Sequence, residues 1–390
     1  MKVVHVSAYF APAWGFGGPP RSLLSLCLAQ QADGLDVEVF TTTANVGDEL
    51  PPAPDGLIVE GVRVKRFPLV SPRWMFGAPS MAKPFGEAAA AATVVHLHGL
   101  FNRTIWTAAE GARRAGAPVV LSPRGMLNPA ALAHHGWRKR AAWTLFDRRV
   151  VHQAAVIHAS SPAERDALTP LVGEARVMYI PHGVSLEPRD RDGRALRAWC
   201  GMPADARYLL FLGRLHRIKR LDLVADTFAR LAPAHPDLHL VMAGPDEQHQ
   251  RAVIESRLGP LRSRVRWTGG VEGPLKTALL EEAVTLLMCS DAESFGLAVA
   301  EALAAGTPPV VTRTCPWALL EEERCGRWVD QTAAAMADAV GEWLTSPLVR
   351  ADRAGRAHAV AARHFAWPAV ARQMTTWYAE IGRGTRLSVA

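Results

Sequence analysis

Two glutamates stand eight residues apart in the run 293–301, which reads Glu-Ser-Phe-Gly-Leu-Ala-Val-Ala-Glu. The apolar spacing and the stop signal at Gly306 predict a helix that starts near Phe295. If the run is fully helical, Glu301 lies about 12 Å along the axis from Glu293, comparable to the length of a nucleotide sugar. One carboxylate would then accept hydrogen bonds from sugar hydroxyls and the other from ribose hydroxyls, with a diphosphate at the helix N-terminus between them. The alternative is a pair of surface glutamates.

A basic turn follows the apolar run 208–212. Four Lys and Arg residues fall within 214–220, and the apolar spacing after Leu221 predicts a helix. Cations and free helix N–H groups converge at such a strand-to-helix turn, which suits a diphosphate. A solvated surface run is the alternative and stays open.

The Gly- and Pro-rich segment 12–22 follows the first apolar strand and precedes a helical pattern. Prolines fit the first helical positions and glycines let a ligand approach the backbone, so the segment predicts a helix N-terminus that favours an anion such as phosphate. A nicotinamide fingerprint needs a third glycine where Pro20 stands, which weakens a dehydrogenase interpretation. A flexible first loop is the other alternative.

His96 and His98 alternate along the strand 94–98 and therefore share one face, with His98 at the carboxyl end, where open α/β sheets bind ligands. Two alternate histidines suit a metal, but no carboxylate or third histidine lies near them in the sequence. We expect no metal here and expect His98 to contact substrate, with a packed histidine as the alternative.

Short apolar runs alternate with helical patterns along the whole chain, which predicts an α/β fold with two Rossmann-like, doubly wound parallel sheets. The boundary is expected at the Pro- and Gly-containing segment 181–188. The amphipathic pattern of 365–381 predicts a helix that packs on protein. The predicted strands are 3–6, 37–41, 94–98, 119–122, 155–159, 177–180, 208–213, 238–243, 265–268, 286–289 and 309–311.

Composition excludes several classes of protein. The chain has 390 residues, 49% of them hydrophobic, which predicts two globular domains. Its net charge of +7 is spread over both halves, so we expect no nucleic-acid partner. Five widely spaced cysteines suit a reducing, cytoplasmic compartment. Residues 1–7 read as a buried strand rather than a secretory signal, and the sequence holds no 18-residue apolar run that would span a membrane.

Six ordered elements together resemble the retaining glycosyltransferases of family 4, which have the two-domain GT-B fold. The similarity covers nearly the whole chain and implies an acceptor-binding domain at 1–187, a nucleotide-sugar-binding domain at 188–364, and a C-terminal helix within 365–390 that crosses back to the first domain. The elements are Gly17-Gly18, 181–184, 213–219, 243–245, 269–271 and Glu-x7-Glu at 293 and 301.

The resemblance also implies roles for individual residues. Glu293 would contact the donor sugar, Arg214 and Lys219 the phosphates, and Glu301 the ribose, while His98 lies beside the reacting sugar. The catalytic candidates are therefore His98, Arg214, Lys219 and Glu293. The donor-binding candidates are Gly17, Gly18, Gly244, Gly270, Ser294, Phe295, Gly296, Leu297 and Glu301.

The segment 122–127, Ser-Pro-Arg-Gly-Met-Leu, looks like the members that act in bacterial surface-polysaccharide assembly, with Arg124 on the acceptor side. This predicts transfer to a glycan or lipid-linked oligosaccharide with retention of configuration. A nucleotide-sugar epimerase of the same fold and a catalytically silent glycan-binding protein are the alternatives. Two positions depart from the family, because Arg220 replaces a glycine and His182 an asparagine.

Residues 134–149 mix basic and aromatic side chains. Such a segment can lie on an anionic membrane surface, where a lipid-linked acceptor is found. A half-buried helix of the first domain explains the pattern equally well. We expect a cytoplasmic protein that can attach to the inner face of the cell membrane. No metal cofactor is expected, because the only near match to Asp-x-Asp, at Asp190 and Asp192, falls in the predicted linker.

Overall fold

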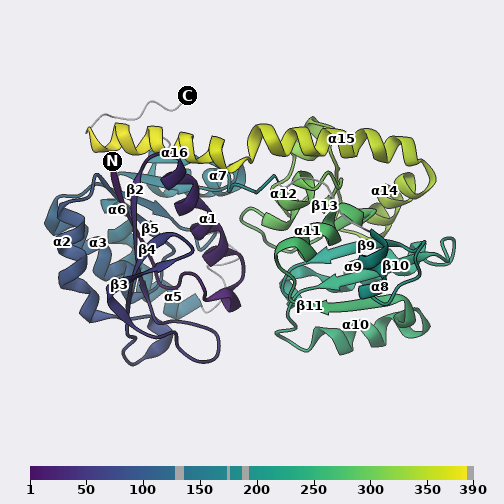
Figure 1. Cartoon of the computed structure of the whole chain (residues 1–390), viewed down its shortest axis with the longest axis horizontal. Helices are drawn as coiled ribbons and strands as arrows, with labels where there is room; N and C mark the ends of the chain where they lie inside the picture. Colours follow the sequence, from purple (N-terminus) through teal and green to yellow (C-terminus); the bar gives the residue numbers. More distant parts are fainter. Residues whose placement is uncertain (128–135, 174–175, 187–192, 384–390) are drawn as a thin grey trace. The chain divides into compact units, whose positions relative to one another are not determined.

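The computed structural model describes residues 1–127, 136–173, 176–186 and 193–383. The chain forms two compact units (Figure 1): Met1–Gly183 together with the segment from Trp367 onward, and Val184–Ala366. The sequence predicted the boundaries at 187 and 364, so the chain leaves the first unit earlier and returns to it slightly later. The predicted linker with Asp190 and Asp192 lies outside the described residues.

The first unit contains a sheet in the order β3-β4-β2-β1-β5-β6-β7-β8, counted over the described residues. All neighbouring strands are parallel except β3 and β4, which are antiparallel. The strands are β1 (Lys2–Ser7), β2 (Asp36–Thr42), β3 (Ala53–Val59), β4 (Val62–Phe67), β5 (Val94–His98), β6 (Val119–Ser122), β7 (Val156–Ala159) and β8 (Val177–Tyr179).

Helices connect these strands on both faces of the sheet, as the alternating pattern predicts. They are α1 (Gly18–Ala32), α2 (Ala82–Ala90), α3 (Arg103–Ala115), α5 (Gly136–Ala142), α6 (Arg148–Gln153), α7 (Pro162–Val172) and α16 (Trp367–Gly382). The shorter turns are η1 (Trp14–Phe16), η2 (Arg73–Met75), η3 (Pro79–Met81) and the π-helical η4 (Trp143–Asp147).

The second unit is a parallel sheet in the order β11-β10-β9-β12-β13-β14 within the described part of the chain. Its strands are β9 (Arg207–Leu212), β10 (Leu238–Ala243), β11 (Val265–Gly269), β12 (Thr285–Met288), β13 (Val310–Thr312) and β14 (Arg327–Val329). Its helices are α8 (Gly193–Trp199), α9 (Leu221–Leu231), α10 (Gln250–Leu258), α11 (Gly273–Glu282), α12 (Leu297–Ala304), α13 (Leu319–Glu322), α14 (Ala333–Thr345) and α15 (Pro347–His364), with the turns η6 (Arg217–Lys219) and η7 (Gly259–Arg264).

All eleven predicted strands are present, with small shifts at their ends, and three strands were missed. The strand β3 contains Pro54 and Gly56, lies at the sheet edge and is largely exposed, and its apolar run is only the three residues 57–59. The strand β4 alternates valines with charged residues, and β14 is only three residues long. Short or half-exposed strands carry little hydrophobic signal.

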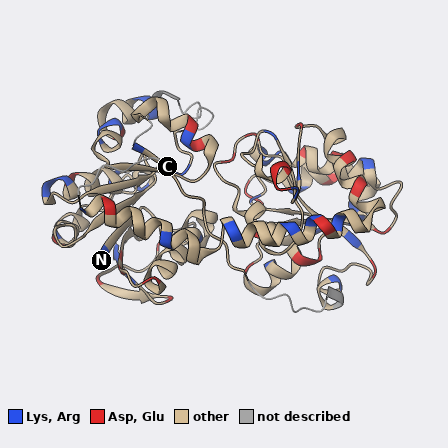
Figure 2. Ribbon diagram, turned by 90° about the horizontal axis from the view of Figure 1, so that it is seen from above, with Lys and Arg blue, Asp and Glu red and all other residues tan. Residues whose placement is uncertain are grey.

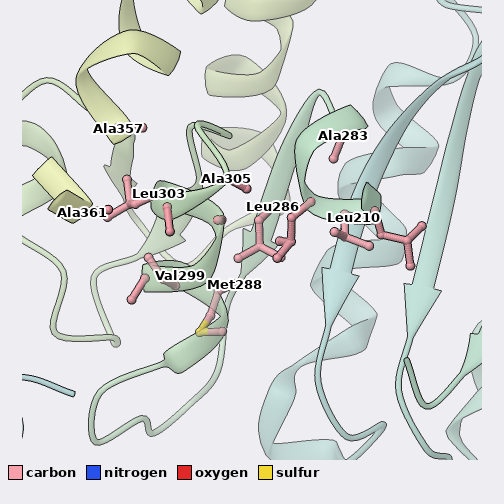
Figure 3. Packing of buried hydrophobic residues seen from close by; sticks show 14 of the residues in the cluster. Leu210, Ala283, Leu286, Met288, Val299, Leu303, Ala305, Ala357 and Ala361 are labelled. Atoms are coloured by element: carbon pink, nitrogen blue, oxygen red, sulfur yellow. The ribbon is translucent and has the colours of Figure 1, made fainter. Parts of the chain in front are cut away.

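Apolar side chains fill both faces of each sheet. In the second unit, α12 lies between the sheet and α15, so both its sides are covered. Figure 3 shows Leu303 of α12 beside Ala357 and Ala361 of α15, with Val299 near Met288 of β12. The helix is therefore held by packing as much as by its own hydrogen bonds.

The C-terminal helix α16 packs on the first unit, beside α1 (yellow and purple in Figure 1). Its buried residues include Val370, Met374 and Tyr378, which join the cluster formed by α1, β1 and β2. Trp367 lies directly against Gly183, where a Cβ atom would fall 2.3 Å from the indole ring. The last helix is thus an integral part of the first core.

Charged side chains are dispersed over both units (Figure 2), in agreement with the absence of a polybasic module from the sequence. Among the described residues, no helix has both the length and the apolarity required to span a membrane.

Candidate active site

Three strand ends of the second unit meet through their backbones. Gly244 follows β10 with φ of 150°, and a Cβ there would lie 1.8 Å from the carbonyl oxygen of Gly213, which follows β9. The N–H of Gly244 donates to the carbonyl of Gly269 at the end of β11. Only glycine allows this approach at 244. At Gly270, by contrast, a Cβ would meet nothing within 4 Å, so packing places no demand for glycine there.

The basic turn after β9 reaches carboxylates from two other strand ends. Lys219 Nζ lies 2.5 Å from Glu293 Oε2, and both side chains are less than one fifth exposed. Arg214 Nη1 lies 2.9 Å from Glu247 Oε2 in the loop after β10. Two cations of the turn are therefore paired with carboxylates at the carboxyl ends of neighbouring strands, while Arg214 and Arg217 are also exposed to solvent.

Arg220 adopts a left-handed conformation with φ of 51°, which explains why the family resemblance expects glycine at this position. Its guanidinium pairs with Asp222 and Asp291 at 2.8 and 3.2 Å. These hydrogen bonds, chiefly with Asp222, raise the pKa of Arg220. Arginine in place of glycine at 220 thus keeps the left-handed turn of the backbone. Its side chain adds ion pairs with Asp222 and Asp291, which lie outside the turn.

The helix α12 begins at Leu297, two residues later than predicted, because Gly296 turns the chain with φ of 88°. The seven residues between the two glutamates are therefore not fully helical, and the expected separation of about 12 Å along one axis does not apply. A Cβ at Gly296 would lie 3.1 Å from Trp317 Nε1, which donates to the carbonyl of Phe295 at 2.5 Å.

This turn leaves the two glutamates in different surroundings. Glu293 and Ser294 precede the helix, while Glu301 lies within it and pairs with Lys276 at 2.7 Å. In the first turn of α12, Val299 N donates to the carbonyl of the capping residue Gly296 at 2.9 Å, while helix geometry leaves the N–H groups of Leu297 and Ala298 without a carbonyl inside the helix. They follow directly after Glu293, where the resemblance expects the diphosphate.

In the first unit, α1 begins at Gly18 after Gly17, whose φ is 81°. The two prolines that follow lack an N–H, so the first four helical residues offer only the N–H groups of Gly18 and Arg21. Arg21 stacks over Trp14, with 4.6 Å from the guanidinium carbon to the ring centroid. The helix N-terminus is where the sequence predicts it, with fewer donors than a typical anion site.

Arg124 lies beside this helix N-terminus. It follows β6 with φ of 54° and donates from Nη1 to Ser22 Oγ on the first turn of α1 at 2.9 Å. Its Nη2 lies 3.2 Å from His98 Nδ1. Its Nε is buried with no hydrogen-bond partner among the described residues. Burial lowers the pKa of Arg124.

Glu164 is a buried carboxylate near Arg124 that no motif or spacing in the sequence singles out. It accepts hydrogen bonds from Gly125 N at 2.5 Å and from Ser160 N and Oγ at 2.8 and 2.7 Å. Its Oε1 therefore holds the loop after β6 and its Oε2 the turn after β7, and neither oxygen is free to act as a base.

The His98 ring is 4% exposed, and both its nitrogens have protein partners. Its Nε2 lies 2.9 Å from His5 Nδ1. His96 stacks on His98 with ring centroids 4.0 Å apart, as the period-2 alternation predicts. In this arrangement the His98 ring cannot exchange a proton with a substrate unless it gives up one of these hydrogen bonds.

The sequence analysis did not select two further histidines, His5 and His158, although each interrupts an apolar strand. The register of parallel strands places His5 opposite His96 and brings His158 onto a neighbouring strand. His5, His96 and His98 form the one group with metal-ligand spacing among the described residues. Each of their ring nitrogens already has a protein partner, so the arrangement does not resemble a ligand set.

Comparison with known proteins decides the family. Residues 17–183 match the glycosyl transferase 4-like domain, and residues 196–359 match the glycosyl transferases group 1. The D-inositol 3-phosphate glycosyltransferase 1 of Catenulispora acidiphila is 30% identical over 338 residues, covering 79% of this chain and 78% of that protein. The chain belongs to the family 4 type of glycosyltransferases.

Two further proteins agree with this assignment. The D-inositol 3-phosphate glycosyltransferase of Xylanimonas cellulosilytica is 29% identical, with 97% of this chain and 96% of that protein covered. HepE from Anabaena, crystallised with UDP and glucose, has a TM-score of 0.77 at 18% identity, with 97% and 100% covered. It shares the GT-B fold with this glycosyltransferase.

Most of the predicted site residues of this glycosyltransferase lie at the carboxyl ends of strands within their own unit. Lys219 and Glu293 are in contact, and Gly244 lies against the loop that carries Arg214. In the first unit, His98 and Arg124 are in contact. Glu301 is set apart from Glu293 by the turn at Gly296.

Replacing Glu301 by alanine should weaken nucleotide binding, because charge-assisted hydrogen bonds to ribose hydroxyls contribute about 1.5–3 kcal/mol each. Calorimetry with UDP and other nucleoside diphosphates measures the change, expected at about 10- to 150-fold in Kd. Glu255→Ala is the matched control, since Glu255 also pairs with a basic side chain, Arg251, but lies on α10. An unchanged affinity in folded Glu301→Ala contradicts the ribose role.

Proposed function

We propose that this glycosyltransferase moves a sugar, with retention of configuration, from a nucleotide-diphosphate sugar to a glycan or lipid-linked oligosaccharide in polysaccharide biosynthesis. The observation that supports it best is the pair of Lys219 with Glu293 beside the N-terminus of α12. A cation, a carboxylate and the N–H groups of a helix N-terminus are groups that suit a sugar diphosphate.

The donor side of this proposal follows from charge. As the sugar leaves, negative charge develops on the diphosphate, and Arg214, Lys219 and the α12 N-terminus stabilise it with preorganised donors. Glu293 orients the sugar through its hydroxyls. The crystal structure of HepE with UDP and glucose supports a nucleotide sugar as the donor for a chain of this fold.

The acceptor side falls to the first unit. Arg124 follows a strand end beside α1 and is partly exposed, so its guanidinium brings positive charge to the side of the unit where an acceptor oxygen would bind. The leaving phosphate can assist deprotonation of the acceptor hydroxyl on the same face of the sugar. This reaction needs no carboxylate base in the first unit, where Glu164 is fully engaged.

A second acceptor class is favoured by the relatives. Both are named D-inositol 3-phosphate glycosyltransferase, and Arg124 at a helix N-terminus suits a phosphate. A phosphorylated polyol is therefore the second candidate acceptor. The two acceptor classes can be told apart, because only an enzyme of the second class would transfer the sugar to a small phosphorylated polyol.

The product should keep the donor's anomeric configuration. Transfer from a panel of UDP-, GDP- and dTDP-sugars to a lipid-linked oligosaccharide and to inositol 3-phosphate identifies donor and acceptor, and NMR of the new linkage gives its configuration. An inverted linkage contradicts the retaining mechanism. Release of an epimer without any acceptor indicates the epimerase alternative instead.

Turnover should need no divalent metal, because Arg214 and Lys219 supply the positive charge that a metal gives in other transferases. Activity should survive excess EDTA, while Arg214→Ala and Lys219→Ala each lower the rate by about 10². Arg217→Ala is the control, since Arg217 is an exposed cation in the same turn. If EDTA abolishes activity and manganese restores it, this assignment is wrong.

We also propose that the segment 134–149 attaches the protein to a membrane. His134 and His135 lie outside the described residues. Farther on, Asp147 is buried and accepts hydrogen bonds from Phe101 N and Trp106 Nε1 at 2.9 and 3.0 Å, so this part packs in the first unit. Leu145, however, is 56% exposed among exposed arginines. The two interpretations are therefore compatible, with one packed face and one free face.

Leu145→Glu should reduce binding to vesicles that contain anionic lipid by about tenfold or more, because it replaces inserted apolar surface with like charge. Co-sedimentation measures the bound fraction. Leu348→Glu is the matched control, because Leu348 is 86% exposed on α15 of the other unit. Equal binding of both variants argues against a membrane role for this segment.

A further inference from the structure

Four histidines lie buried in the first unit, and every one of their ring nitrogens has a hydrogen-bond partner. Two groups at the ends of this network have fixed roles. Arginine can only donate hydrogen bonds, and a backbone carbonyl can only accept them. The direction of every intermediate hydrogen bond can therefore be derived from either end.

From the first end, the Arg124 guanidinium donates to His98 Nδ1 at 3.2 Å. A neutral His98 then carries its proton on Nε2, which donates to His5 Nδ1 at 2.9 Å. His5 in turn carries its proton on Nε2 and donates to Gln30 Oε1 at 2.8 Å, an oxygen that can only accept. All three steps run in the same direction.

From the other end, the carbonyl of Ile180 accepts from His158 Nε2 at 2.8 Å. A neutral His158 then accepts on Nδ1 from Ser122 Oγ at 2.7 Å. Because the Ser122 hydroxyl has a single proton, its oxygen accepts from His96 Nε2 at 2.7 Å. His96 Nδ1 is left as an acceptor.

The two halves meet at Tyr378 on α16. Its hydroxyl donates to His96 Nδ1 at 2.6 Å and accepts from Gln30 Nε2 at 3.2 Å. The amide of Gln30 thus accepts from His5 and donates to Tyr378, so both derivations agree on one orientation. The result is a single directed chain, in order Arg124, His98, His5, Gln30, Tyr378, His96, Ser122, His158 and the Ile180 carbonyl.

This chain requires all four rings to be neutral with the proton on Nε2. Burial lowers the pKa of His5 and His158 to about 4, although their hydrogen bonds to Gln30 and Ile180 act in the opposite direction. Burial, followed by the neighbouring charges, lowers the pKa of His96 and His98 well below the usual range. The other groups that face His98 are Arg124, His5, His96 and His158, while Tyr9, Glu164 and Cys27 act on Arg124.

We propose that His5, Gln30 and Tyr378 are positioning residues for Arg124, because they close a directed hydrogen-bond chain that makes His98 Nδ1 an obligatory acceptor for its guanidinium. If the chain ran the other way, His98 Nδ1–H would point at a cation. The proposal rests on the proposed function only where it assigns Arg124 to the acceptor. The short distances between the ring nitrogens of His5, His96 and His98, which resemble those of a metal site, are then a consequence of this hydrogen-bond chain.

The first test needs no substrate. Long-range ¹H–¹⁵N spectra of the full-length protein should show four rings protonated on Nε2 only, unchanged from pH 8 to pH 5.5. The Nη signals of Arg124 should be resolved, because its two hydrogen bonds slow rotation. A ring protonated on Nδ1, or one that titrates in this range, overturns the chain.

The second test removes one step of the chain. His5→Leu takes away the acceptor for His98 Nε2–H, so the Arg124 signals should average and KM for the acceptor should rise about tenfold, with Kd for the nucleoside diphosphate unchanged. His5→Asn should restore both, because its amide oxygen can stand where Nδ1 accepts. His239→Leu is the control for losing a buried histidine, since His239 lies on β10 of the other unit.

If His5→Leu does not fold, Gln30→Met repeats the test, because it removes the next hydrogen bond of the chain, from His5 to Gln30. Equal effects of His5→Leu and His5→Asn mean that the side chain matters only for packing, and the positioning role is then wrong. If Arg124 loses its resolved signals while acceptor KM stays constant, the chain stands and the acceptor role of Arg124 fails. The two failures are therefore distinguishable.

Discussion

The carboxyl ends of parallel strands converge at one edge of each sheet, and the candidate site depends on this constraint. Arg214, Gly244 and Glu293 follow three neighbouring strands of the second unit, so residues about 80 positions apart become neighbours without any special device. The contact between the Gly244 and Gly213 backbones brings the loops closer than side chains would allow. The same constraint joins His98 to Arg124 in the first unit.

Charged side chains at these sheet edges are paired with groups of opposite charge. In the second unit, Lys219 pairs with Glu293, so neither charge is left alone in a partly buried place. Arg220 tolerates a left-handed conformation that suits glycine, while Asp222 and Asp291 hold its guanidinium. Three cations of the turn, Arg214, Lys219 and Arg220, are therefore each paired with a carboxylate of the protein.

In the first unit, buried polar groups extend far beneath the candidate site. Residues of four strands, α1 and the C-terminal helix share one hydrogen-bond network, and Arg124 is its one charged member among the described residues. A buried polar group without a partner is costly, so each member holds its neighbour in one orientation. Tyr378, close to the end of the chain, thereby completes a core that begins with His5 on the first strand.

The sequence by itself determined the alternation of strands and helices, the two doubly wound units, the strand-end location of His98 and the motif elements of the family. Each of these is carried by local periodicity or by short spacings. Tertiary structure alone decided that the turn at Gly296 separates Glu301 from Glu293. It also decided that Glu164 accepts hydrogen bonds from the protein, and that His5 lies opposite His96 on the neighbouring strand. Those outcomes depend on the register between strands and on backbone turns, because partners distant in sequence have no spacing that a pattern can reveal.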